Sequence, residues 1–127
     1  MIRRIVLATA AVAALSLPVH AEGDAEKGES VFKKCRACHA VGEGAKNKVG
    51  PVLNGIFGRT AGTGEDYKYS KAMIEAGEGG LVWDDTTIAE YLVKPRDFIP
   101  KNKMAFAGLK KEDDVENVIA YLKQFSE

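Results

Sequence analysis

Histidine and cysteine are both scarce in this chain of 127 residues. There are two histidines, His20 and His39, and two cysteines, Cys35 and Cys38. A structural zinc site takes four Cys or His ligands, and no second cluster of such residues follows the first. Cysteines three positions apart close only a very small ring, so a disulfide between them would join no distant segments. We therefore expect neither a zinc-stabilised nor a disulfide-stabilised fold.

An excess of charge of one sign is also absent, because 18 basic residues balance 18 acidic ones. A nucleic-acid-binding domain is expected to be basic, so binding to nucleic acid is disfavoured. Internal repeats, low-complexity tracts and the alternating pattern of long β-strands are absent as well. The length allows one compact domain, and helical patterns occur at both ends and in the middle. The sequence therefore predicts an all-α fold.

Long apolar runs are limited to the N-terminus. Arg3 and Arg4 give a basic start, an apolar run follows at residues 5–17, and Ala21 ends a sequence typical of signal-peptide cleavage sites. The run has about thirteen residues, whereas a helix that spans a bilayer needs roughly 20. We predict a signal peptide at residues 1–21, cleaved after Ala21, and an exported domain at residues 22–127. The alternative is an uncleaved membrane anchor.

One pentapeptide, Cys35-Arg36-Ala37-Cys38-His39, carries most of the recognisable chemistry. Cysteines at i and i+3 lie on one side of a helical turn, and the next residue lies beside them. The Cys-x-x-Cys-His run is typical of covalent haem c attachment, in which both thiols form thioethers with the haem vinyl groups. His39 would then ligate the iron. A thioredoxin-like redox site is the weaker alternative, because no βαβ pattern surrounds the cysteines.

The second axial ligand of such a haem has few candidates. If His20 leaves with the signal peptide, only His39 remains, and methionine becomes the expected partner. Met73 lies in a predicted short helix, where packing in the core is the simpler role. Met104 lies in a loop bounded by Pro95, Pro100 and Gly108 and is therefore favoured. Two further candidates, at high pH only, are the amines of Lys101 and Lys103.

Helix signals begin at Asp24, a good N-cap for a helix that runs toward Cys35. Gly28 lies inside this helix, where glycine costs about 1 kcal/mol relative to alanine, so we expect another helix to approach it closely. The later helices are predicted from Ser70 to Ala76, ended by Gly77, from Asp84 or Asp85 to a stop at Pro95, and over residues 112–125. Loops are predicted at residues 40–67 and 95–109, which Gly and Pro interrupt repeatedly.

Further short motifs follow the pentapeptide in a specific order. They are Val49-Gly50-Pro51, Gly55-Ile56-Phe57-Gly58-Arg59, Tyr67-Lys68-Tyr69-Ser70, Trp83, Tyr91-Leu92, Pro95, Ile99-Pro100, Lys103-Met104-Ala105-Phe106-Ala107-Gly108 and Ile119-Ala120-Tyr121-Leu122-Lys123. With these motifs the chain resembles the class I c-type cytochromes, close to bacterial cytochrome c2 and similar to mitochondrial cytochrome c. The resemblance implies a small cytochrome c fold, in which crossing N- and C-terminal helices, short helices and loops surround one covalent haem.

The resemblance also implies roles for individual residues. The Pro51 carbonyl would accept a hydrogen bond from the His39 ring, and Tyr91 would hydrogen-bond near the Met104 sulfur. Phe106 would pack over the haem edge. The inner haem propionate would be held or neutralised by Arg59, Tyr69 and Trp83.

The chain departs from the family pattern at two positions, and the same pattern implies one contact between helices. Met73 stands where many relatives have asparagine, and Lys101-Asn102 stands where a Gly-Thr pair is common. Gly28 and Phe32 would cross Tyr121 on the last helix.

The function implied by the resemblance is that of a soluble periplasmic one-electron carrier, not an enzyme. A cytochrome bc complex would be the donor, and cytochrome c oxidase or a photosynthetic reaction centre the acceptor, with a monomeric carrier docking transiently. Basic residues flank the two haem-binding segments and would steer acidic partners: Lys33, Lys34, Arg36, Lys46, Lys48, Lys94, Lys101, Lys103, Lys110 and Lys111. Evenly scattered surface lysines are the alternative. Two other functions stay open: a haem peroxidase or ligand sensor in which Met104 dissociates, and an electron-relay subunit of a larger complex.

Overall fold

A computed structural model describes residues 23–126 of the chain, and the predicted signal peptide lies outside these residues. The described part is helical and contains no β-strand apart from an isolated bridge between Thr60 and Val82, which confirms the all-α prediction. Its helices are α1 (Ala25–Phe32), α2 (Lys71–Glu78), α3 (Asp85–Val93), α4 (Pro95–Phe98) and α5 (Glu112–Lys123). None of the helices in residues 23–126 combines the length and apolar character of a membrane span.

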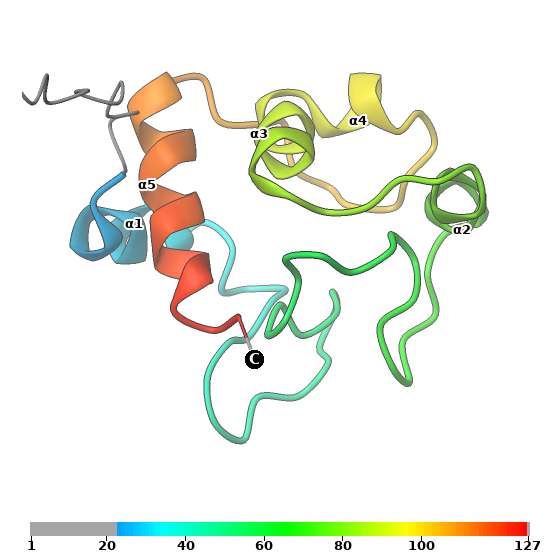
Figure 1. Ribbon diagram of the computed structural model, residues 1–127, viewed down its shortest axis with the longest axis horizontal. Coiled ribbons are helices and arrows are strands. Elements are labelled where there is room, and N and C mark those ends of the chain that lie inside the picture. The colour runs from blue at the N-terminus through cyan, green and yellow to red at the C-terminus, as the bar shows by residue number, and fades with distance from the viewer. Residues whose placement is uncertain (1–22, 127) are drawn as a thin grey trace, which may run out of the picture.

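The terminal helices α1 and α5 pack across each other on one side of the molecule (Figure 1). Gly28 allows this contact, because a Cβ at that position would lie 1.9 Å from the carbonyl oxygen of Asn117 and 2.8 Å from Tyr121 Cβ. One turn later, the rings of Phe32 and Tyr121 pack with their centroids 5.3 Å apart. The predicted crossing, and the packing reason for a glycine within α1, are confirmed.

Side chains cap three of the helices at the predicted places. Asp24 accepts hydrogen bonds from the backbone N–H groups of the first turn of α1, and Ser70 accepts one from the Met73 N–H of α2. Asp84 and Thr87 form a reciprocal capping box at the start of α3. In α5, three acidic residues occupy the first turn, where they complement the helix dipole.

Three predicted helix ends were wrong by a few residues. The regular part of α1 ends at Phe32, before Cys35, and hydrogen-bonded turns continue from there. Helix α2 continues through Gly77 to Glu78, because this glycine serves packing: a Cβ there would lie 1.9 Å from the carbonyl oxygen of Ala61. Helix α5 ends at Lys123, two residues earlier than predicted.

The loop prediction for residues 95–109 was wrong at its beginning, where Pro95–Phe98 forms the short helix α4. Pro95 ends α3, as predicted, but it also occupies the first turn of α4. Proline suits that position because its fixed φ is helical and its missing N–H would have no partner there.

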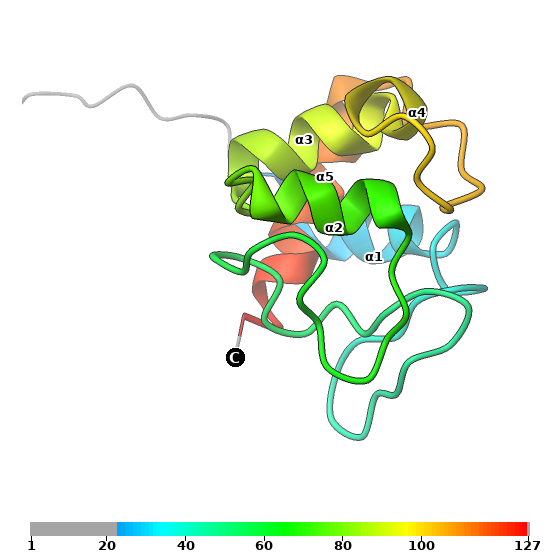
Figure 2. The same cartoon turned by 90° about the vertical axis from the view of Figure 1, so that its right-hand side faces the viewer.

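The predicted loop at residues 40–67 contains no helix and lies below α2, α3 and α4 in both ribbon views (Figures 1 and 2). Asn54 holds it by exchanging two hydrogen bonds with the backbone of Gly42. Its second half pairs with the segment before α3, where Trp83 N–H donates to Arg59 O over 2.9 Å.

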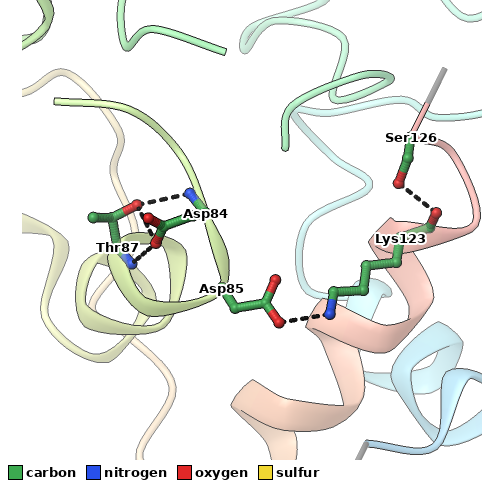
Figure 3. A network of polar contacts seen from close by, with 5 residues as sticks. All are labelled: Asp84, Asp85, Thr87, Lys123 and Ser126. Atoms are coloured by element: carbon green, nitrogen blue, oxygen red, sulfur yellow. Dashed lines mark hydrogen bonds and ion pairs between the residues drawn. The ribbon is translucent and has the colours of Figure 1, made fainter. Parts of the chain in front are cut away.

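A surface network joins the start of α3 to the end of α5 (Figure 3). Lys123 Nζ lies 2.5 Å from the Asp85 carboxylate, and the Ser126 hydroxyl donates to the Lys123 carbonyl. Both charged side chains are about half exposed, so the ion pair contributes at most about 1 kcal/mol. The network links two helices that pack against each other and both contribute residues to the central cavity.

Candidate functional site

A mainly apolar cavity lies between the helices and the long loop. Its walls come from the turn after α1, the 49–70 loop, helices α2, α3 and α5, and the segment after α4. All ten predicted cofactor-binding residues line this one cavity: Cys35, Cys38, His39, Pro51, Arg59, Tyr69, Trp83, Tyr91, Met104 and Phe106. Residues far apart in the sequence are therefore brought together as expected.

The cysteines and the histidine share a single hydrogen-bonded turn. Cys38 N–H donates to Cys35 O over 3.1 Å, and His39 N–H donates to the same carbonyl over 2.9 Å. Burial raises the pKa of the Cys35 thiol, and Cys38 adds to this, whereas the charge of Lys34 acts in the opposite direction. A redox-active Cys-x-x-Cys pair needs a lowered thiol pKa, so the thioredoxin-like alternative is disfavoured.

The ring of His39 is fixed by its neighbours in the Gly50-Pro51 segment. His39 Nδ1 lies 2.7 Å from Pro51 O and donates to it, which is the contact that the family resemblance implied. The other ring nitrogen, Nε2, is then the one with a lone pair for a metal. Burial lowers the pKa of His39, as does the charge of Lys48, whereas the hydrogen bond to Pro51 raises it.

Gly50 leaves the space that the histidine ring occupies. A Cβ at this buried glycine would lie 2.5 Å from His39 Cε1 and within 2.9 Å of both ring nitrogens. The sequence prediction included Gly50 in a motif but gave it no role. Its position directly before Pro51 was the available signal.

The Met104 side chain has a hydrogen-bonding neighbour in α3. The Tyr91 hydroxyl lies 3.8 Å from Met104 Sδ, as the resemblance implied, and 3.4 Å from Asn102 Oδ1. Burial raises the pKa of Tyr91 to about 12, and Tyr67 contributes to the increase. Tyr91 therefore remains a protonated donor at physiological pH.

The competing ligand candidates lie in different environments. Met73, on α2, lines the same cavity as Met104, and both side chains are partly buried. The Lys103 amine donates to the carbonyl oxygen of Lys68 and lies 4.5 Å from the centre of the Tyr67 ring, so it already has other partners. Lys101 is exposed.

Three side chains that could bind a carboxylate, those of Arg59, Tyr69 and Trp83, also line the cavity. Trp83 is 6% exposed, and its backbone pairing with Arg59 places both side chains at the cavity. The Tyr69 hydroxyl accepts a hydrogen bond from Gly64 N–H over 2.9 Å. A guanidinium, an indole N–H and a phenol can all donate to a propionate.

The donor set fits a covalently attached haem. Two thiols on one turn, an imidazole with one free nitrogen and a methionine thioether line a cavity with mainly apolar walls. Asn102 also lines it, and it was noted from the sequence only as a departure from the family pattern. That departure was the available signal that Asn102 has a specific role in this chain.

Comparisons with known proteins identify the family to which the chain belongs. The cytochrome c family matches residues 25–126 of the chain. The chain is 59% identical over 101 residues to cytochrome c2 of Agrobacterium tumefaciens (strain II Chrys), covering 80% of this chain and 91% of that protein. It is 48% identical over 124 residues to cytochrome c2 of Blastochloris viridis, covering 98% and 94% of the two chains. The structure of cytochrome c2 from Rhodospirillum centenum matches with a TM-score of 0.79 and 45% identity, covering 83% of this chain and 100% of that chain. The chain therefore belongs to the cytochrome c family of electron carriers and binds one haem c covalently through Cys35 and Cys38.

Proposed function

We propose that the protein is a soluble periplasmic one-electron carrier in which His39 and Met104 ligate the haem iron. The observation that carries this proposal is that both side chains line one cavity, each with a hydrogen-bonding neighbour: Pro51 for the His39 ring and Tyr91 for the Met104 sulfur. The bound haem supplies reversible one-electron chemistry, and two protein ligands leave no iron position open to a substrate.

The surrounding residues serve the carrier by holding the ligands and controlling the environment. The Pro51 carbonyl orients the His39 ring and makes its free nitrogen a better ligand. The Tyr91 hydroxyl, by donating to the Met104 sulfur, adjusts its electron donation. Phe106 and the apolar walls limit the access of water, and low solvent access is one of the factors that sets a haem potential.

Arg59, Tyr69 and Trp83 would bind the inner propionate. Their side chains line the cavity and can offer donors to a carboxylate that enters it. Charge-assisted hydrogen bonds of this kind offset the cost of placing the carboxylate near an apolar wall.

The compartment follows from the N-terminal sequence. We propose that residues 1–21 direct export and are removed after Ala21, so that the mature carrier comprises residues 22–127. Mass spectrometry of the purified protein tests this directly: a mature chain that starts at residue 22 is expected, and one that starts at Met1 would contradict it.

The partners would be membrane redox complexes that dock at the cavity opening. Lys34 and Lys103 line the cavity and are exposed, as are the other basic residues predicted to flank it. Such a surface would steer the carrier toward acidic docking sites and favour short-lived complexes. A cytochrome bc complex is the proposed donor, and cytochrome c oxidase or a photosynthetic reaction centre the acceptor, with the carrier acting as a monomer.

A potentiometric titration with optical spectra tests this function. We expect a single one-electron transition, the red-region absorption band of a Met-ligated ferric haem, and no cyanide binding at neutral pH. Rapid cyanide binding by the resting protein would instead indicate an open iron, as in a peroxidase or ligand sensor. Purification in a fixed complex with another subunit would indicate a relay subunit.

A further inference from the structure

The side-chain amide of Asn102 has hydrogen-bonding partners on all sides, in the segment that carries Met104 and on α3. Its Nδ2 donates to Pro95 O over 2.9 Å and to Ile99 O over 2.8 Å. Its Oδ1 accepts from the Met104 backbone N–H over 2.8 Å. The Tyr91 hydroxyl lies 3.4 Å from the same Oδ1 and 3.8 Å from Met104 Sδ, and its single hydrogen is shared between these two acceptors. An asparagine amide has two N–H donors and an oxygen that accepts two bonds, so three of these bonds are complete and the fourth shares the Tyr91 hydrogen with the Met104 sulfur.

These four bonds also define which way the amide faces. Both neighbours of Nδ2 are carbonyl oxygens, which can only accept, and both neighbours of Oδ1 carry hydrogens. A flipped amide would lose the two bonds to the carbonyls and the bond from the Met104 N–H. Aspartate lacks the two donors, threonine has a single O–H, and glutamine is one methylene longer, so no common substitute reproduces the set.

The bonds connect three separate elements. Pro95 begins α4 and Ile99 follows its end, Tyr91 lies on α3, and Met104 lies two residues after Asn102. Asn102 thus connects the Met104 backbone to α3 and to α4. The Tyr91 hydroxyl lies near Asn102 Oδ1 and Met104 Sδ at once, so its position relative to the sulfur depends on Asn102.

The turn that leads into Asn102 is strained. Lys101 has φ 67°, in the left-handed region that glycine favours, and such a conformation persists only when its surroundings hold it. Asn102 provides part of that support, because its backbone N–H donates to Ile99 O over 3.2 Å and its side chain donates to the same carbonyl.

We infer that Asn102 is a positioning residue for the iron's methionine ligand. By holding the Met104 backbone and the Tyr91 hydroxyl together, it keeps the sulfur in place and raises the reduction potential of the haem. The inference rests on the proposed ligation by Met104, and it adds a residue that keeps the Met104 sulfur in position for this ligation.

The test compares Asn102→Ala and Asn102→Gln with the wild-type holoprotein, and Lys101→Gly serves as the neighbouring control. Cyanide can reach ferric iron only after the sulfur leaves, so we expect both Asn102 variants to bind it at least about tenfold faster. We also expect a lower reduction potential, because a methionine ligand raises it, and faster exchange of the Met104 amide hydrogen. Lys101→Gly, which keeps the four side-chain bonds, should show none of these changes.

Three outcomes distinguish the possibilities. A wild-type cyanide rate and potential in the Asn102 variants would overturn the positioning role, even if their melting temperature falls. If Asn102→Ala does not assemble with haem, Asn102→Gln, which keeps the amide group, decides by the same readouts. If Met104→Ala keeps the wild-type spectrum, the proposed ligation is wrong, and the proposed role of Asn102 is wrong with it. If Met104→Ala loses the Met-ligated spectrum while the Asn102 variants are unchanged, only the role of Asn102 is refuted.

Discussion

At the scale of single residues, the histidine side of the cavity depends on a missing side chain. Gly50 is buried against the His39 ring. The Nδ1 atom of the same ring donates a hydrogen bond to the Pro51 carbonyl. The ring has no freedom to move aside without losing that hydrogen bond. Glycine at this position therefore helps to set the position of His39, the proposed ligand, although it carries no functional group.

Gly50→Ala should destabilise the holoprotein by about 1–3 kcal/mol, because the new Cβ would overlap the His39 ring. Its reduction potential should shift as the ring leaves the Pro51 carbonyl. Gly79→Ala is the matched control, since a Cβ there would have no neighbour nearer than 3.4 Å and φ is −78°. Thermal unfolding and potentiometry measure both effects. Equal stability and equal potential in the two variants would show that Gly50 has no such role.

Individual contacts were only partly predictable at this scale. The ligand-bearing residues could be identified because their chemistry is rare in the chain: two cysteines and two histidines. The Pro51 and Tyr91 contacts came from the family pattern, and the structure contains both. The roles of Gly50 and Asn102 were not predicted, because the space around a glycine and the partners of an amide depend on the path of distant loops.

At the scale of elements, the crossing of α1 and α5 is the main contact between chain ends. Alanine is the better helix former by about 1 kcal/mol, yet a Cβ at Gly28 would overlap the Asn117 carbonyl. The close approach of two backbones outweighs the local preference. Glycine is therefore favoured at position 28, although this position lies within a helix.

Gly28→Ala should therefore lower the free energy of unfolding by about 1–3 kcal/mol, despite the gain in helix propensity. Denaturant unfolding of the holoprotein provides the measurement, and Gly79→Ala again controls for the substitution itself. A more stable Gly28→Ala variant would mean that α1 and α5 do not approach as closely as described.

The start of α3 should give the stability a defined dependence on pH. Hydrogen bonds from the Thr87 and Thr86 backbone and the Thr87 hydroxyl lower the pKa of Asp84 despite some desolvation. Because the folded pKa lies below the unfolded value of about 3.9, this contribution is complete above pH 4 and is lost as the pH falls further. Asp84→Asn keeps an acceptor at the cap but does not titrate. We expect wild-type stability to fall more steeply than that of the variant below about pH 4, measured by urea unfolding; parallel profiles would refute the assignment.

Helix starts were more predictable than helix ends. Asp24, Ser70 and Asp84 could be identified as caps because their side chains satisfy local backbone donors. The ends depend on tertiary packing instead: Gly77 looked like a terminator but lies inside α2 against the Ala61 backbone. Helix α4 was missed because Pro95 both ends one helix and begins the next.

At the scale of the whole molecule, the fold arranges short elements and long loops around one cavity. Ile56, Ile88 and Leu109 belong to the buried core and also line the cavity, so core and cavity wall are continuous. The order of the motifs was sufficient to predict the family and the set of residues that meet in the cavity. The mutual positions of the loops were not predictable, because no local pattern specifies them.

The charge around the cavity opening should make electron transfer depend on salt. We expect the bimolecular rate with an acidic redox partner to fall as ionic strength rises, and to fall several-fold in Lys34→Glu at low salt. Lys27→Glu, an equal change of charge at an exposed α1 position away from the cavity lining, should have a smaller effect. Stopped-flow mixing measures these rates. Equal effects of the two substitutions, or indifference to salt, would favour evenly scattered surface charge.

The most direct test of the central claim is the red-region absorption band of the ferric holoprotein in two methionine variants. Met104 and Met73 both line the cavity, so the same substitution at each distinguishes a methionine that ligates the iron from one that only lines the cavity. Proposed ligation by His39 and Met104 predicts that Met104→Ala abolishes the band and lowers the reduction potential, whereas Met73→Ala retains the band. Persistence of the band in Met104→Ala, or its loss in Met73→Ala, would contradict the claim.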